Sequence, residues 1–262
     1  MKIINKKSLG QNFLVDKNII KKIINLVKIE NKNIIEIGPG EGALTDEIIK
    51  KKPKSLVTIE KDNNLYKKLC FKYRNLKVVE NINADILKFD IEKLNYKNSI
   101  LFGNLPYNIS SQILVKLLRF KKWPPCFNDI IFMFQKELGE KILGKFPSEN
   151  YGRISILANY RLFLFSKFDV SSNCFLPKPK VNSTVIHFKP KVETDYQIKD
   201  LKNLEKITNV LFSNKRKMIK KNIVKILNKN EITKIDDFDL KLRPSKIRPE
   251  IYYKIAELYE SR

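Results

Sequence analysis

Gly103-Asn104-Leu105-Pro106-Tyr107-Asn108-Ile109-Ser110 is the stretch of sequence that decides the fold. The apolar run before it, residues 99–102, predicts a buried strand, and the apolar residues from 110 to 118 recur at helical spacing. Ser110 is a suitable cap for that helix. We therefore expect residues 104–107 on a loop at the carboxyl end of a strand, where open α/β sheets bind their ligands.

The loop has the composition of a socket for a flat heterocycle that carries an amino group. Pro106 fixes its own φ and keeps Leu105 out of the helical region. The Asn104 amide, the Leu105 carbonyl and the Tyr107 ring are then held in one geometry. The two oxygens can accept hydrogen bonds from an exocyclic amine while the ring stacks on the heterocycle. An ordinary strand-to-helix turn is the alternative, because Asn, Pro and Tyr all occur in turns.

Three earlier predicted strands also end in residues suited to a nucleoside ligand. Gly38 and Gly40 follow the first and let a ligand approach the backbone closely. Glu60 ends the second, about 20 residues further on, where a carboxylate would bind ribose hydroxyls. Asp85 follows the third and suits an adenine amino group, with an Asx turn as the alternative. The third strand is expected at residues 76–79, after a helix at 63–73, and strands that alternate with helices predict a parallel sheet.

Charge is the strongest signal in the composition. The chain of 262 residues has 52 Lys and Arg against 28 Asp and Glu, a net charge of +24. Codon bias would enrich lysine without making acids this scarce, so the balance favours a polyanionic partner, namely nucleic acid. The chain has no long uncharged apolar run, so a membrane is a less favoured partner.

Cysteine usage and the N-terminus indicate the compartment. Cys70, Cys126 and Cys174 are widely spaced and odd in number, which argues against a disulfide framework and against a zinc site. The basic N-terminus lacks the apolar segment of a secretory signal. We therefore expect a cytoplasmic protein that binds no metal.

The second half of the chain predicts a further aromatic contact and a separate helical domain. Pro177 and Pro179 stiffen the loop that follows Phe175, which is expected to be a second aromatic plate opposite Tyr107; an apolar plug is the alternative. After Pro190 the patterns are helical, over 201–212, 218–227 and 251–259. We thus predict domains at 1–190 and 191–262.

A basic cluster in the second domain is expected to bind RNA phosphates. Its members are Lys215, Arg216, Lys217, Lys220 and Lys221. A solvated helix face is the alternative, but the cluster precedes an apolar-periodic helix in a strongly basic protein.

Together these motifs resemble the small-subunit rRNA adenine N6-dimethyltransferase family. The likeness covers almost the whole chain and rests on the segments Leu9-Gly10-Gln11-Asn12-Phe13-Leu14, Glu36-Ile37-Gly38-Pro39-Gly40, 104–110, Tyr151-Gly152-Arg153-Ile154-Ser155 and Phe175-Leu176-Pro177-Lys178-Pro179. The resemblance implies an α/β fold: a class I S-adenosylmethionine-dependent methyltransferase (Rossmann-like) domain followed by a small all-helical C-terminal domain.

The resemblance also implies the activity and the site. The reaction would be dimethylation of two adjacent adenines near the 3′ end of small-subunit rRNA, by direct in-line transfer to a flipped base. It implies a monomer that acts on an assembling ribosomal subunit. Tyr107 and Phe175 would hold the adenine, and S-adenosylmethionine would be bound by Asn12, Leu14, Gly38, Gly40, Glu60, Asp85 and Asn104.

Two other interpretations stay open at this point. The macrolide-resistance methyltransferases of large-subunit rRNA share the Asn-Leu-Pro-Tyr motif, although residues 9–11, Pro39 and 151–153 favour the small-subunit enzymes. Relatives also act in ribosome assembly and as transcription factors, so a binding role without catalysis is the alternative class. One departure from the family is Lys215-Arg216-Lys217, where an Arg-rich run is usual; Lys holds phosphate without a bidentate fork.

Overall fold

The computed structural model describes residues 12–94 and 96–262 and divides the chain into two compact units. Of the described residues, the first unit contains 12–94, 96–116, 124–139 and 164–190, and the second contains 117–123, 140–163 and 191–262. Two segments before residue 190, namely 117–123 and 140–163, belong with the C-terminal helices, and the domains at 1–190 and 191–262 stay a prediction. Leu9, Gly10 and Gln11 lie outside the described residues.

The first unit is built on a seven-stranded sheet of order β4-β3-β2-β5-β6-β9-β7. Neighbouring strands from β4 to β6 are parallel, as the sequence predicted, and β6 pairs antiparallel with β9. The strands are β2 (Asn33–Ile37), β3 (Ser55–Glu60), β4 (Val79–Asn83), β5 (Ser99–Asn104), β6 (Phe127–Gln135), β7 (Leu162–Val170) and β9 (Ser183–Pro190).

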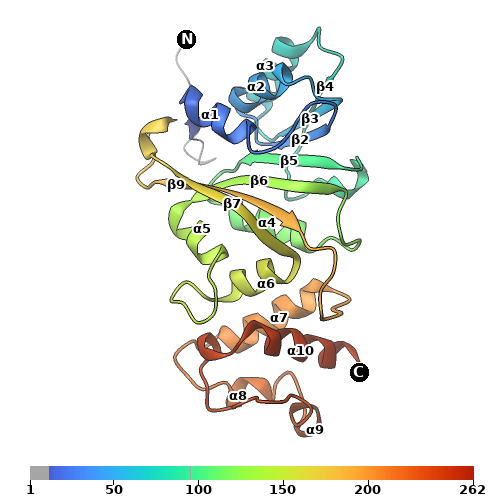
Figure 1. Ribbon diagram of the computed structural model, residues 1–262, viewed down its shortest axis with the longest axis vertical. Coiled ribbons are helices and arrows are strands. Elements are labelled where there is room, and N and C mark those ends of the chain that lie inside the picture. Colours follow the sequence, from blue (N-terminus) through green and yellow to red (C-terminus); the bar gives the residue numbers. More distant parts are fainter. Residues whose placement is uncertain (1–11, 95) are drawn as a thin grey trace. The chain divides into compact units, whose positions relative to one another are not determined.

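Helices cover both faces of this sheet (Figure 1). One side carries α1 (Lys17–Ile24), α2 (Ala43–Lys50) and α3 (Asn63–Tyr73), and the other carries α4 (Ser110–Leu118) and α5 (Lys136–Ile142). Central strands enclosed in this way are mostly apolar on both faces, which is why residues 100–102 of β5 form a hydrophobic run and Glu36 is the only charged residue of β2. The carboxyl ends of these strands lead into the loops at which a ligand can be bound.

A second, two-stranded sheet joins the N-terminal segment to the loop before β9. In it β1 (Phe13–Leu14) pairs antiparallel with β8 (Phe175–Leu176), so that Leu14 faces Phe175 and Phe13 faces Leu176. Directly opposed residues point to the same face of a ladder. Accordingly Leu14 and Phe175 are both buried in the hydrophobic core.

The second unit is helical. Its helices are α6 (Arg153–Arg161), α7 (Leu201–Phe212), α8 (Lys220–Ile223), α9 (Lys229–Ile232) and α10 (Pro249–Glu260). Short 3₁₀ turns occur in the two units at Ile91–Leu94, Ser172–Cys174 and Pro244–Lys246. Within the second unit Tyr253 donates to the carbonyl of Ile156 (3.0 Å), which ties α10 to α6.

The helix predicted over 218–227 was wrong in its extent. Only residues 220–223 are α-helical, and turns follow. Asn222 is buried and its amide donates to Oγ of Ser213 (3.3 Å). Asn228 accepts from the backbone amide of Glu231 (2.9 Å) and so begins α9. The Asn228 cap therefore begins a separate short helix after the turns, beyond the predicted range.

Candidate active site

A cavity of about 620 Å³ lies in the first unit. It is bordered by the carboxyl ends of β2, β3 and β5 and by the N-terminal segment, as expected for an open α/β sheet. Nine of the predicted site residues line it: Asn12, Leu14, Gly38, Gly40, Glu60, Asn104, Leu105, Pro106 and Tyr107. Asp85 and Phe175 are not among the lining residues.

The glycine-rich turn after β2 forms the floor of the cavity. Gly40 has φ +61°, and a Cβ there would lie 3.0 Å from the Phe13 ring. Only glycine adopts this conformation readily and leaves room for that ring. The Gly40 amide donates to Oε2 of Glu60 (3.2 Å), so the turn is fixed to the end of β3.

Glu60 is buried at the edge of the cavity and is 6% exposed. Its other oxygen, Oε1, accepts from the backbone amide of Asp62 (2.8 Å). Burial raises the pKa of Glu60, and the two backbone donors oppose this shift. A carboxylate has about four acceptor positions, so the side chain retains capacity for ligand hydroxyls.

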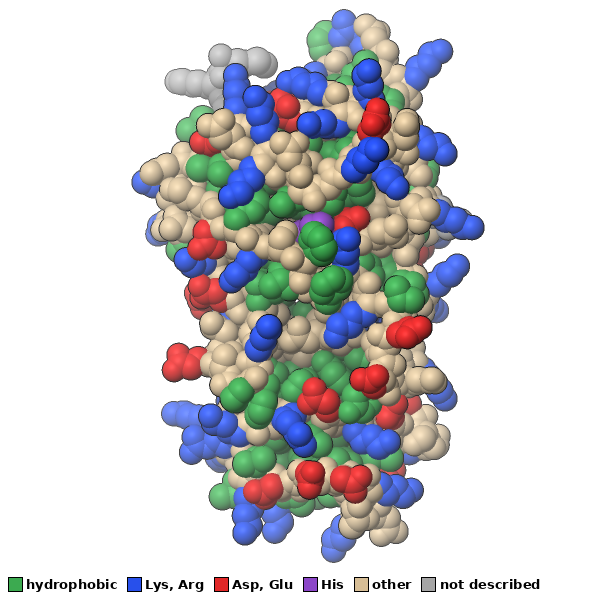
Figure 2. Space-filling view, in the orientation of Figure 1, with side chains coloured by type: hydrophobic (Ala, Val, Ile, Leu, Met, Phe, Trp, Pro, Cys, Tyr) green, Lys and Arg blue, Asp and Glu red, His purple; other side chains and the backbone are tan. Residues whose placement is uncertain are grey.

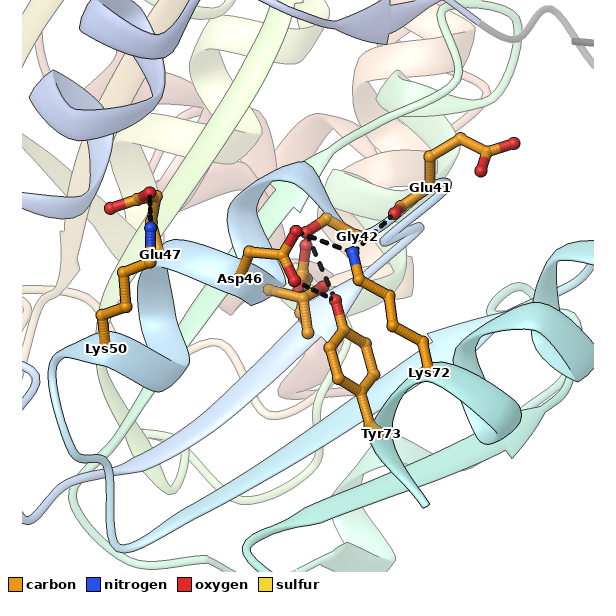
Figure 3. Close-up of polar contacts among 9 residues, drawn as sticks. Glu41, Gly42, Asp46, Glu47, Lys50, Lys72 and Tyr73 are labelled. Atoms are coloured by element: carbon orange, nitrogen blue, oxygen red, sulfur yellow. Dashed lines mark hydrogen bonds and ion pairs between the residues drawn. The ribbon is translucent and has the colours of Figure 1, made fainter. Parts of the chain in front are cut away.

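Helix α3 holds the outer side of the turn (Figure 3). Asp46 on α2 accepts from the Tyr73 hydroxyl (2.7 Å) and from Nζ of Lys72 (2.7 Å). Lys72 also donates to the carbonyl of Glu41 (3.4 Å). A Cβ on Gly42, whose φ is +86°, would overlap the Tyr73 hydroxyl. Sequence reasoning missed this support, because its members come from two helices separated along the chain.

Glu36 is a buried carboxyl behind the turn that sequence reasoning also missed. It sits in β2, is 1% exposed, and its Oε2 accepts from the Thr45 hydroxyl (2.7 Å). Burial, reinforced by the carboxylates of Asp46 and Glu60, raises the pKa of Glu36 to about 7. The signal available in the sequence was a lone acid inside an apolar strand.

The Asn104 amide is oriented by the N-terminal segment. Asn104 ends β5, and its Nδ2 donates to the backbone carbonyl of Asn12 (3.2 Å). This bond uses the donor side of the amide and leaves Oδ1 as its acceptor. The turn that follows is closed by Ile109, whose amide donates to the Pro106 carbonyl (3.1 Å). The predicted socket is thus a constrained loop at a strand end.

Asp85 and Phe175 are placed differently from the other predicted residues. One Asp85 oxygen accepts from the Leu87 amide (2.9 Å), which is the Asx-turn arrangement, and the other pairs with Lys61 (2.8 Å). Lys61 is the main cause of a lowered pKa at Asp85. Phe175 is 3% exposed and forms part of the core, as a plug would. Their ligand roles stay predictions.

Neither a membrane span nor a metal cluster is found in the part of the chain that the structure describes. Its helices are too short or too polar to cross a bilayer. No group of three or more His, Cys, Asp or Glu residues is arranged to hold a metal ion within 12–94 and 96–262.

The sheet is parallel from β4 to β6, with a glycine turn after β2, a buried acid at the end of β3 and Asn-Leu-Pro-Tyr after β5. This combination defines a Rossmann-like methyltransferase domain. Two solved structures share the fold. A dimethyladenosine transferase from Plasmodium falciparum aligns with a TM-score of 0.72 at 25% identity, over 93% of this chain and 95% of that one. The 23S rRNA methyltransferase ErmE aligns with a TM-score of 0.70 at 22% identity, over 95% of this chain and 100% of that one.

The chain belongs to the ribosomal RNA adenine dimethylase family, whose profile matches residues 3–261. It is 42% identical to the ribosomal RNA small subunit methyltransferase A of Pelagibacter ubique, over 97% of both chains. The protein of the same name from Malacoplasma penetrans is 36% identical over 95% of this chain and 90% of its own. The protein is therefore an rRNA adenine dimethyltransferase, as the motifs predicted.

Proposed function

We propose that this enzyme uses S-adenosylmethionine to dimethylate N6 of two adjacent adenines near the 3′ end of small-subunit rRNA, during assembly of the subunit. The names of the two relatives described above support the choice of subunit. The observation that carries the chemistry is the Asn104 amide, whose nitrogen is bound to the Asn12 carbonyl and whose oxygen is thereby kept for an amine.

The cavity has the donor set expected for this cofactor. Glu60 is a buried carboxylate beside a glycine turn whose backbone is accessible to a ligand, a combination that suits a ribose and its neighbouring groups. When bound, S-adenosylmethionine supplies an electrophilic methyl group. Asn12, Leu14, Gly38 and Gly40 would enclose it from the turn and from the N-terminal segment, and Asp85 would bind its adenine after releasing Lys61.

Residues of the Asn104 loop would prepare the target amine. Adenine N6 is a weak nucleophile because its lone pair is delocalised into the ring, and a carboxamide is too weak a base to deprotonate it. Asn104 Oδ1 and the Leu105 carbonyl accept the amine hydrogens and direct the lone pair toward the methyl group. Both contacts strengthen as positive charge develops on nitrogen, so they favour the transition state. Tyr107 stacks on the flipped base.

Transfer of radiolabelled methyl groups tests the proposal. The substrates are assembling small subunits, mature small subunits and large subunits, each prepared without the modification. We expect label in adjacent dimethyladenines of assembling small subunits. Label in large subunits instead would identify a large-subunit enzyme, and binding to small subunits without label would identify an assembly factor with no catalytic role there.

Cofactor affinity is expected to depend on Glu60. Glu60→Ala removes a charge-assisted acceptor and should weaken S-adenosylmethionine binding by about 1.5–3 kcal/mol. It also frees the Gly40 amide, so Glu60→Gln, which keeps an acceptor there, should lose less. Titration calorimetry on the folded variants measures both, and unchanged affinity in Glu60→Ala would remove this residue from the cofactor site.

The basic cluster of the second unit is a proposed RNA contact. Lys215, Arg216, Lys217, Lys220 and Lys221 are all exposed, and no described carboxylate forms an ion pair with any of them. Lys and Arg side chains are also spread widely over the face shown in Figure 2. A test of the cluster therefore needs a control for loss of charge alone.

Salt dependence of RNA binding provides that test. Replacing Lys217, Lys220 and Lys221 together by Gln should flatten the slope of log affinity against log salt by about 2, because each phosphate contact contributes roughly 0.7–0.9. A matched variant with Gln at Lys202, Lys234 and Lys241, which are exposed in the same unit, should change the slope less. Equal slopes for the two variants would make the cluster a solvated face.

A further inference from the structure

The hydroxyl of Tyr107 is bound to a strand two positions away in the sheet. Tyr107 lies in the loop after β5, and its oxygen is 2.6 Å from Oγ of Ser183, the first residue of β9. Strand β6 lies between β5 and β9. The bond therefore passes across the carboxyl end of β6, where Gln135 pairs with Ser183.

Ser183 is a rigid anchor for this bond. The residue is fully buried and belongs to the β6–β9 ladder. On one side of it the Asn182 carbonyl accepts from the Lys136 amide (3.0 Å), and on the other the Thr184 hydroxyl donates to the Phe168 carbonyl (3.2 Å). Its backbone is therefore fixed on both sides, and the position of its hydroxyl is determined by the sheet.

Tyr107, in contrast, lies on a loop and is partly open to the cavity. Two side-chain torsions decide where its ring lies and how the ring plane is turned. A bond at the para position limits the first torsion, because the far end of the ring can no longer swing away from β9. The second torsion turns the ring about an axis through the hydroxyl oxygen, and the bond restrains it only through the preference of a phenol O–H for the ring plane. Burial raises the pKa of Tyr107, so the phenol is neutral at physiological pH. Either hydroxyl can then donate in the bond between Tyr107 and Ser183.

We infer that Ser183 is a positioning residue for the methyl transfer, whose hydroxyl holds the Tyr107 ring at the position where the target adenine stacks. This inference rests on the proposed stacking role of Tyr107. Ser183 contacts neither the substrate nor the cofactor in this scheme. Its effect should reach the reaction only through the tyrosine hydroxyl, and this distinguishes it from a residue that merely stabilises β9.

A double-mutant cycle tests the inference. We expect Ser183→Ala to lower kcat by about 5- to 10-fold, the factor for one net hydrogen bond. Tyr107→Phe should produce a similar loss, and the double variant should be no slower than either single variant. Cofactor affinity, measured by calorimetry, should be unchanged in all three. Ser99→Ala is the matched control, because Ser99 is a buried serine that begins β5 in the same sheet; its effect should be equal with and without the Tyr107→Phe substitution.

Three results would overturn the inference: no loss of turnover in Ser183→Ala, an equal loss from Ser183→Ala whether or not Tyr107→Phe is present, or a parallel loss of cofactor affinity. Unfolding free energies of the same variants establish that each is folded. The kinetics are run on whichever ribosomal subunit the wild-type enzyme methylates. The choice of subunit, which decides the proposed function, therefore leaves the outcome of the cycle unaffected.

Discussion

Asn104→Ala is expected to lower the rate of methyl transfer by about 10²–10³, the range for removing one preorganised polar contact from a transition state. The alanine cannot accept a hydrogen bond from the target amine, and it also loses the bond to the Asn12 carbonyl (3.2 Å). The Leu105 carbonyl then remains as the acceptor. Single-turnover rates on one RNA substrate measure the loss without contributions from product release.

Asn104→Asp separates the two functions of the amide. Aspartate keeps an acceptor for the amine but has no donor for the Asn12 carbonyl, so its carboxylate would face another oxygen. We expect activity between those of wild type and Asn104→Ala. Calorimetry on both variants shows whether the cofactor still binds. If Asp and Ala are equally inactive while both bind the cofactor normally, Asn104 does not act by accepting the amine hydrogens.

Elements with a strong local pattern were predicted closely. Helices α3 and α7 have the predicted bounds, because their apolar periodicity coincides with capping acids, Asp62 and Asp200, at the N-termini. Strand β4 was predicted over 76–79 and is found at Val79–Asn83. It is an edge strand with polar residues, whereas Leu76 belongs to a turn closed by its bond to the Tyr73 carbonyl (2.9 Å).

The residues of the site likewise include some whose positions the sequence predicts and others whose contacts it does not. The parallel arrangement brings strand ends together, so Gly38, Glu60 and Asn104 could be assigned to one cavity from their positions alone. Contacts between distant segments have no local signature: Asn12 and Asn104 are 92 residues apart, and Tyr107 and Ser183 are 76 apart. The burial of Phe175 likewise follows from its pairing with β1, which the sequence did not indicate.

The second large expected effect is a dependence of folding stability on pH, which Glu36 causes. The pKa of Glu36 is raised from 4.5 to about 7 in the folded protein. Between these values the unfolded chain loses the proton while the folded protein keeps it, so the contribution of Glu36 to stability falls as pH rises from 4.5 to 7 and then levels off. The difference between these two pKa values corresponds to about 3 kcal/mol of stability.

Glu36→Gln is expected to abolish this loss, because the amide stays neutral at every pH and keeps an acceptor for the Thr45 hydroxyl. The unfolding free energy of the variant minus that of wild type should therefore rise by about 3 kcal/mol between about pH 4.5 and pH 8. Urea unfolding of the cofactor-free proteins measures this difference, and Glu30→Gln, at an exposed site, shows how much comes from loss of surface charge. The dominant cause of the shift is burial, with Asp46 and Glu60 adding repulsion. If the difference in unfolding free energy between variant and wild type stays constant over this range, Glu36 is ionised in the folded protein. Lys72 or solvent would then stabilise its negative charge.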